Sequence, residues 1–105
     1  MIKVSIMYPT SPEARFDHDY YRDRHMPLVA ELLGEACLRW TVDRGVNGGR
    51  HGIDPPYVAM CHIYSDSVDA FQEAFGASAK QIMADVGNYT DISPVMQISD
   101  VVVDG

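Results

Sequence analysis

The sequence has few of the residues that cross-link a small domain or bind a metal ion. Its two cysteines, Cys37 and Cys61, lie in apolar stretches far apart, which favours free thiols over a disulfide framework. The four histidines, at positions 18, 25, 51 and 62, include no i,i+4 pair, and no carboxylate stands at metal-ligand spacing from them. We therefore expect no metal site, and the free thiols favour a reducing, cytoplasmic location.

The sequence also lacks the motifs that hold nucleotides or activate a nucleophile. Neither Gly-x-Gly-x-x-Gly nor Gly-x-x-x-x-Gly-Lys occurs, so the phosphates of a cofactor have no recognisable cradle. The serines and cysteines stand in no nucleophile elbow. No apolar run approaches the ~20 residues that cross a bilayer, and no charged leader with a long apolar segment follows Met1. We expect no cofactor, no membrane span and no export signal.

Basic residues are scarce, and nearly all of them lie in the first half of the chain. Eight Lys and Arg stand against fifteen Asp and Glu, which gives a net charge of −7, and residues 51–105 contain Lys80 as their single basic residue. Nucleic acids and anionic membranes are therefore poor partners.

The 105 residues, 47% of them hydrophobic, suffice for one core, so we expect a single domain over residues 1–105.

The apolar pattern alternates between strand and helix periods. Alternating or continuous apolar runs predict four strands, at residues 2–8, 37–46, 57–64 and 95–103. Helical spacing predicts a helix from Asp17 to about Leu33, and either one helix broken at Gly76 or two helices up to Val86. This βαββαβ order predicts an α+β fold of the ferredoxin-like type, a four-stranded antiparallel sheet with both helices on one face.

The other face of such a sheet has no helix to cover it. Met7, Trp40, Val58 and Met60 add apolar side chains that need burial beyond those packed under the helices. A bare apolar sheet face is a typical association surface, and two-fold pairing of two sheets covers it most simply. We therefore expect a homodimer formed through this face.

One histidine stands on the apolar side of the first predicted helix. Tyr21, His25, Leu28 and Leu32 are spaced four, three and four residues apart and form one stripe, so His25 is expected to face inward. Pro27 interrupts the backbone hydrogen bonding next to it and should bend the helix there. An inward imidazole can move a proton at neutral pH, although the simpler role is that of a core histidine bonded to a freed carbonyl.

Five short motifs, in order along nearly the whole chain, resemble the EthD family. They are Phe16-Asp17-x-x-Tyr20-Tyr21-x-x-x-His25-Met26-Pro27-Leu28-Val29, Pro55-Pro56-Tyr57-Val58-Ala59, Asp66-Ser67-Val68-x-Ala70-Phe71, Asn88-Tyr89-Thr90-Asp91-Ile92 and Gln97-Ile98-Ser99. The resemblance implies a dimeric α+β barrel, in which two ferredoxin-like sheets pack together and each subunit has a cavity between its helices and its own sheet. It also implies that the motif histidine is His25.

The resemblance leaves the reaction open. The family is named for a protein that accompanies a haem-thiolate monooxygenase in ethyl tert-butyl ether degradation, and relatives with the same barrel include cofactor-independent monooxygenases, lactone isomerases and cyclases or decarboxylases. Our leading hypothesis is cofactor-independent proton transfer on a small apolar, oxygenated or aromatic metabolite. The alternatives are a non-enzymatic binding or accessory protein that supports an oxidoreductase, and a cofactor-free monooxygenase.

The candidate site follows from these hypotheses. We expect His25 to transfer the proton, with Tyr21 either bonding a substrate oxygen or orienting the imidazole, and with Asp91 pairing with His25 or with Arg24. His62 and Trp40 stand on strands that border either the cavity or the dimer seam, where packing is the simpler role. The residues expected to contact the ligand are Tyr20, Arg24, Leu28, Trp40, His62 and Tyr89.

Overall fold

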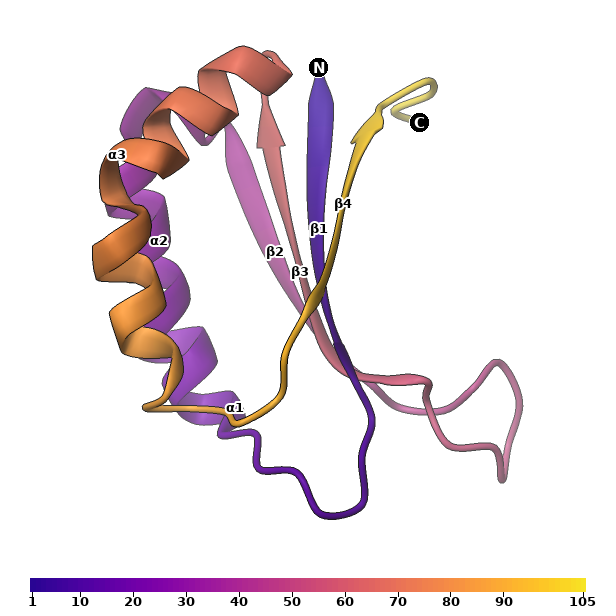
Figure 1. The fold of residues 1–105 in the computed structure, drawn as a ribbon. Helices are drawn as coiled ribbons and strands as arrows, with labels where there is room; N and C mark the ends of the chain where they lie inside the picture. The colour runs from indigo at the N-terminus through magenta and orange to yellow at the C-terminus, as the bar shows by residue number, and fades with distance from the viewer.

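The computed structural model describes residues 1–105 as one antiparallel sheet with helices on a single face (Figure 1). The strands are β1 (Ile2–Pro9), β2 (Arg39–Arg44), β3 (Tyr57–Ser65) and β4 (Val95–Asp100). They pair antiparallel in the order β2-β3-β1-β4, so β1 and β3 are central and β2 and β4 form the edges. The predicted ferredoxin-like α+β fold is confirmed. None of the helices is long and apolar enough to cross a membrane.

The first helical segment has three parts. α1 (His18–Tyr20) is followed by a π-helical turn, η1 (Tyr21–His25), and then by α2 (Met26–Leu33). The carboxylate of Asp17 caps its start by accepting a hydrogen bond from the Tyr20 backbone N–H at 3.0 Å. Gly34, at φ 56°, ends it in a conformation that glycine adopts without strain. A short 3-10 turn, η2 (Gly34–Ala36), leads to β2.

The π-helical turn changes which side chains of this segment face inward. The backbone N–H of Met26 bonds to the carbonyl of Tyr21, five residues earlier, just before Pro27, which has no N–H to donate. This wider turn inserts one residue into the helical register. The predicted stripe therefore holds at Tyr21 and His25 and is wrong beyond them, because the next buried positions are Met26, Val29 and Leu33. Leu28 and Leu32 are only partly buried.

The second long helix, α3 (Val68–Val86), runs without interruption through Gly76. The predicted break is wrong, because a glycine on an exposed helix face costs only about 1 kcal/mol relative to alanine and leaves the backbone hydrogen bonds intact. The Ser67 hydroxyl begins the helix by accepting a hydrogen bond from the Ala70 backbone N–H at 3.0 Å.

Replacing Ser67 by alanine should lower the free energy of unfolding by about 1 kcal/mol, because a helix N–H loses its acceptor. Urea unfolding followed by circular dichroism measures the effect. The matched control is Gln72→Ala, on an exposed position of the same helix, which should change stability by less than about 0.5 kcal/mol. Equal losses in the two variants would contradict the capping role.

Alternation along the strands divides the sheet into two faces. On the helix side lie the buried residues Val4, Tyr8, Ala59, Cys61 and Ile63, which form the core with α2 and α3. Met7 and Met60 lie opposite each other on the outer face, as predicted. Trp40 does not lie on the outer face, because it pairs with Ile63 on the helix side.

The outer face of the sheet is also more polar than expected. Ser5 and His62 are paired on it, next to Thr41 of β2 and Gln97 of β4. The expectation of a wholly apolar outer face is therefore wrong, because this face carries both apolar and polar side chains.

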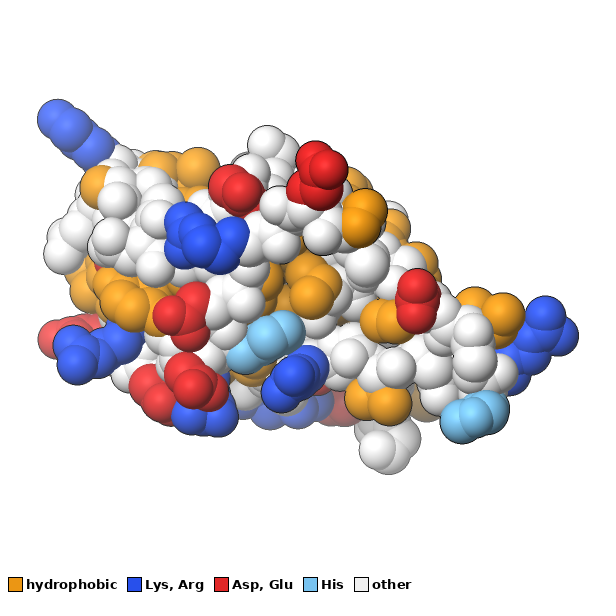
Figure 2. Space-filling view, turned by 90° about the horizontal axis from the view of Figure 1, so that it is seen from below, with side chains coloured by type: hydrophobic (Ala, Val, Ile, Leu, Met, Phe, Trp, Pro, Cys, Tyr) orange, Lys and Arg blue, Asp and Glu red, His pale blue; other side chains and the backbone are white.

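At the end of the molecule where α1 begins, acidic and basic side chains are intermixed on the surface (Figure 2).

Candidate active site

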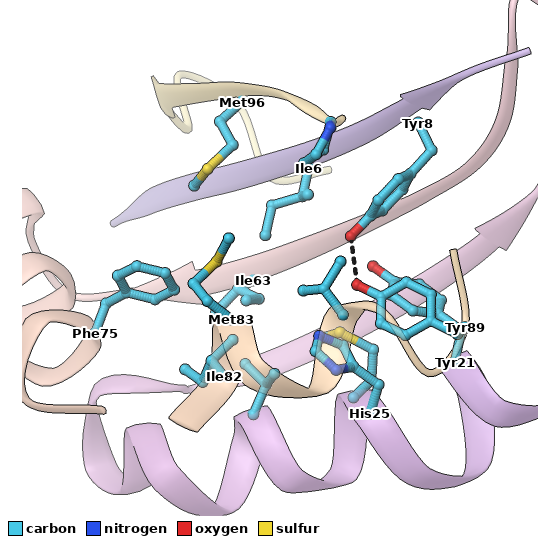
Figure 3. Close-up of a pocket in the computed structure, with 14 residues that line it drawn as sticks. Ile6, Tyr8, Tyr21, His25, Ile63, Phe75, Ile82, Met83, Tyr89 and Met96 are labelled. Atoms are coloured by element: carbon cyan, nitrogen blue, oxygen red, sulfur yellow. Dashed lines mark hydrogen bonds between the residues drawn. The ribbon is translucent and has the colours of Figure 1, made fainter. Parts of the chain in front are cut away.

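A cavity of about 60 Å³ lies between the helices and the sheet (Figure 3). Its walls come from η1 and α2, from α3 and the turn after it, and from β1, β3 and β4. The lining is apolar apart from one imidazole and three phenols: His25, Tyr8, Tyr21 and Tyr89. No cluster of three or more His, Cys, Asp or Glu side chains is placed to hold a metal ion. Any chemistry that the protein's own groups perform in this cavity therefore depends on His25 and the phenols.

His25 is held by a carboxylate of the opposite helix. Its Nδ1 lies 2.9 Å from Oδ2 of Asp85, and the two side chains are 5% and 15% exposed. The other oxygen of Asp85 accepts hydrogen bonds from the Tyr20 hydroxyl at 2.6 Å and from the Asn88 amide at 2.9 Å. Three donors thus fix the carboxylate, and the carboxylate fixes the imidazole ring.

The environment of this pair favours a neutral imidazole and an ionised carboxylate. Burial lowers the pKa of His25 below its ordinary value, although Asp85 acts in the opposite direction. Burial acts to raise the pKa of Asp85, but the hydrogen bonds from Tyr20, Asn88 and His25 outweigh it and keep this pKa low. Since a carboxylate only accepts hydrogen bonds, Nδ1 carries the proton and donates it to Asp85. The lone pair is then on Nε2, which has no hydrogen-bond partner in the protein.

The three phenols meet at one end of the cavity, beside His25 (Figure 3). The hydroxyls of Tyr8 and Tyr89 are 2.7 Å apart and hydrogen-bonded. Tyr21, only 1% exposed, has a hydroxyl with no hydrogen-bond partner, and burial strongly raises its pKa. Its ring stacks on His25 at a centroid distance of 5.6 Å. The site therefore holds an unpaired hydroxyl and an unpaired ring nitrogen on two residues whose rings stack.

Three of the residues expected at the site belong to it, two by lining the cavity and one through Asp85. Tyr21 and Tyr89 line the cavity with it. Tyr20 does not line the cavity, because it stands one position away around the helix, and its hydroxyl instead reaches Asp85. Its contact with the site runs through that carboxylate.

Asp91 and Arg24 do not take the places expected of them. The carboxylate beside His25 comes from Asp85, whereas Asp91 follows the turn after α3 and accepts a hydrogen bond from the Arg15 backbone N–H at 2.8 Å. Arg24 lies on the exposed side of the π-helical turn and outside the cavity lining. The expected pairing of Asp91 with His25 or Arg24 is therefore wrong.

The remaining three expected contacts lie outside the cavity. Leu28 is displaced by the extra residue of the π-helical turn. Trp40 packs near Met26 in a region with no open volume. His62 faces the opposite side of the sheet, because β3 alternates and Ile63 points toward the helices; its Nδ1 lies 2.8 Å from the Ser5 hydroxyl.

Sequence reasoning missed Asp85 and Tyr8. Asp85 stands in the last turn of α3, where the helix dipole disfavours a negative charge, and that unfavourable placement was the available signal. Tyr8 ends the inward-facing alternation of β1, Ile2, Val4 and Ile6, and so its place on the core side was predictable. The hydrogen bond between Tyr8 and Tyr89 joins residues 81 positions apart and has no local signal.

Replacing Asp85 by asparagine should lower the pKa of His25 further, because the hydrogen bond and the charge of Asp85 both raise it. An NMR titration of the His25 ring protons measures the shift. The matched control is Asp91→Asn, which removes a carboxylate bonded to a backbone N–H elsewhere and should leave the His25 titration unchanged. An unchanged His25 pKa in Asp85→Asn would show that the two groups do not interact in solution.

The chain and its fold are similar to known proteins. The family model of the EthD domain matches residues 9–93. An EthD-like protein from Ralstonia eutropha JMP134, known from its crystal structure, is 50% identical with a TM-score of 0.96, over 99% of this chain and 94% of that chain. No curated protein matches the chain.

More distant structures share the fold. An EthD family protein from Bacillus halodurans C-125 is 22% identical with a TM-score of 0.64, over 95% of this chain and 97% of that one. HapK from Hahella chejuensis is 14% identical with a TM-score of 0.60, over 100% and 96%. With the EthD domain covering most of its length and a half-identical EthD-like relative covering nearly all of it, this protein belongs to the EthD family.

Proposed function

We propose that the protein binds a small apolar, oxygenated or aromatic metabolite beside His25 and moves a proton on it without a cofactor. The observation that carries this proposal is the orientation of the imidazole. Nδ1 is bound to Asp85, and His25 lines an apolar cavity with Nε2 unpaired. A base needs a free lone pair in reach of the substrate, and this ring offers one.

Asp85 acts through His25 as a positioning residue. It selects the tautomer in which Nε2 is basic, and its negative charge stabilises the imidazolium that forms when Nε2 takes a proton. Tyr20 and Asn88 in turn keep Asp85 ionised and in place. The arrangement allows a buried histidine, neutral at rest, to become charged during a reaction.

Tyr21 is the second group proposed to contact the substrate. Its hydroxyl is a buried donor without a partner, and such a group is costly unless something in the functional state accepts from it. A substrate oxygen fills that role. Tyr89 supports the site through its ring, 4.5 Å from that of His25.

Hydrogen–deuterium exchange tests the proposal without knowledge of the full reaction. A panel of small carbon acids, including neutral ketones, β-diketones and phenols, is incubated with the protein in deuterium oxide and followed by proton NMR. At least one compound should exchange faster with the protein than in buffer, and the acceleration should depend on His25. Exchange that never exceeds the buffer rate across the panel would contradict proton transfer.

The almost wholly apolar lining favours a second candidate, a binding or accessory protein that holds a hydrophobic intermediate for a partner oxidoreductase. In that case a ligand from the same panel binds in the cavity and leaves chemically unchanged. Binding that does not vary with pH near the pKa of His25 would support this candidate over catalysis.

The protein is also proposed to work as a homodimer in a reducing compartment. Met7 and Met60 lie opposite each other on the outer face of the sheet, and both cysteines are free. Two sheets packed by this face would cover the methionines. Sedimentation should then give twice the chain mass of 11.7 kDa. A sedimentation mass of one chain would contradict the dimer.

A further inference from the structure

We infer that the ligand of this cavity is an uncharged carbonyl compound with an acidic C–H next to the carbonyl, bound with its oxygen at Tyr21 and its apolar remainder toward Met83 and Met96. The inference rests on the proposed function of the same site and adds to it the class and the orientation of the substrate.

The charges around the cavity disfavour an ionic ligand. No lysine or arginine lines it, so a carboxylate or phosphate would enter an apolar space without a counter-charge. The ionised Asp85 behind His25 adds repulsion for any anion. A cation gains little either, because Asp85 is already bound by Tyr20, Asn88 and His25. A neutral ligand meets neither penalty.

The unpaired atoms define the reacting group. Tyr21 offers an O–H donor, and His25 offers an acceptor on Nε2. A carbonyl oxygen accepts from Tyr21, and a C–H on the neighbouring carbon can approach His25. In the proton transfer, the C–H bond of the ligand breaks and an N–H bond forms on Nε2 of His25. The C–H electron pair becomes the C=C bond of an enolate, and the carbonyl π pair moves onto the oxygen bonded to Tyr21. Return of the proton to carbon or oxygen completes an isomerisation and needs no oxidant.

The two ends of the cavity differ in polarity. His25, Tyr21 and Tyr89 lie at one end, and Phe75, Met83 and Met96 at the other (Figure 3). Met83 and Met96 line the cavity and are also 58% and 49% exposed, so this end reaches the surface. Methionine side chains adapt to varied apolar shapes. The apolar part of the ligand therefore lies between the methionines, and the carbonyl reaches the interior.

A matched pair of probes tests the class of ligand. 4-Phenyl-2-butanone and 3-phenylpropanoate have nearly the same shape, but the first is a neutral ketone and the second is an anion. NMR titration of the protein should show at least about tenfold tighter binding of the ketone, with shifts at His25 and Tyr21. Equal or tighter binding of the carboxylate would overturn the inference, as would binding of neither probe up to its solubility limit.

The variant Tyr21→Phe tests the orientation. It removes one hydroxyl from the cavity and should weaken binding of the ketone about three- to tenfold, the loss of one neutral hydrogen bond. Binding of toluene, which has no oxygen to accept that bond, should not weaken, and this comparison separates a lost hydrogen bond from a damaged cavity. Equal effects on the two probes would overturn the assignment of the carbonyl to Tyr21.

Exchange of the ketone's own protons separates this inference from the proposed function. If the ketone binds as expected but its C–H protons exchange no faster than in buffer, the class of ligand stands and proton transfer fails. If the carboxylate is preferred, the class of ligand fails, while exchange on the rest of the panel still decides whether His25 transfers protons.

Discussion

Replacing His25 by glutamine should slow protein-catalysed exchange of a bound carbon acid about 10²- to 10⁴-fold, the usual contribution of a positioned base. Glutamine has a similar reach and an amide that can donate to Asp85, so the carboxylate keeps a partner. It has no nitrogen that accepts a proton near neutral pH. The cavity should thus remain formed while the base is lost, and proton NMR of the exchanging C–H group measures the difference.

The matched control for this variant is His51→Gln. His51 lies exposed in the loop between β2 and β3, away from the cavity lining, so its replacement should leave exchange unchanged. Thermal unfolding of both variants checks that each is folded at the assay temperature. An undiminished rate in His25→Gln would remove His25 from the mechanism, and equal losses in both variants would indicate a general effect on the protein.

The pH dependence of exchange supplies a test that does not depend on mutation of the base. Burial lowers the pKa of His25 below its ordinary value of 6.5, with Asp85 opposing the shift. The rate should rise with pH through the lowered pKa of His25 in the folded protein, as the imidazole loses its proton, and then level off. In Asp85→Asn this rise should move to lower pH, which loss of packing alone would not cause.

The same shift links stability to pH. Between the lowered pKa of His25 in the folded protein and 6.5, its ordinary value, the unfolded chain binds more protons than the folded one. The free energy of unfolding therefore rises with pH in that window. The contribution is complete above the unfolded pKa and is lost as the pH falls through the folded pKa.

The fold was predictable because its signals are local. Alternation in β1 and the continuous apolar run of β3 set which faces are buried, and Asp17 and Gly34 mark the ends of the first helical segment. Two features of the helices could not be predicted from the periodicity of apolar residues. The π-helical turn before Pro27 shifted the inward stripe by one residue, and Gly76 proved compatible with a continuous α3.

The site was predictable in part, at His25, Tyr21 and Tyr89. His25 and Tyr21 are the two ends of the π-helical turn, and both are buried as the helical spacing predicted. Asp85 lies 60 residues away from His25, and the sequence holds many carboxylates that compete for the same role. Asp91 was expected because it follows the second helix within the motif Asn88-Tyr89-Thr90-Asp91-Ile92, but it bonds to the backbone of Arg15. Long-range pairing of this kind depends on how α2 and α3 pack, which spacing along one helix does not determine.

Replacing Tyr89 by alanine should lower the free energy of unfolding by about 3–5 kcal/mol, a large part of the stability of a domain of this size. Tyr89 is fully buried, and its ring packs against those of Tyr8, Phe16, Tyr21 and His25. Its backbone carbonyl also accepts a hydrogen bond from Asp17 at 2.8 Å. Removing the ring leaves a cavity where β1, the first helical segment and the turn after α3 meet, and urea unfolding measures the loss.

The variant Tyr89→Phe separates the ring from the hydroxyl. It keeps the packing and removes the hydrogen bond to Tyr8, so the loss should be about 1 kcal/mol. Because Tyr21 keeps its hydroxyl in this variant, the ketone affinity should change less than it does in Tyr21→Phe. Equal destabilisation by Tyr89→Ala and Tyr89→Phe would contradict the packing role. It would place the main contribution of Tyr89 in its hydrogen bond, so that the phenols would hold the fold together through their hydroxyls and not through their rings.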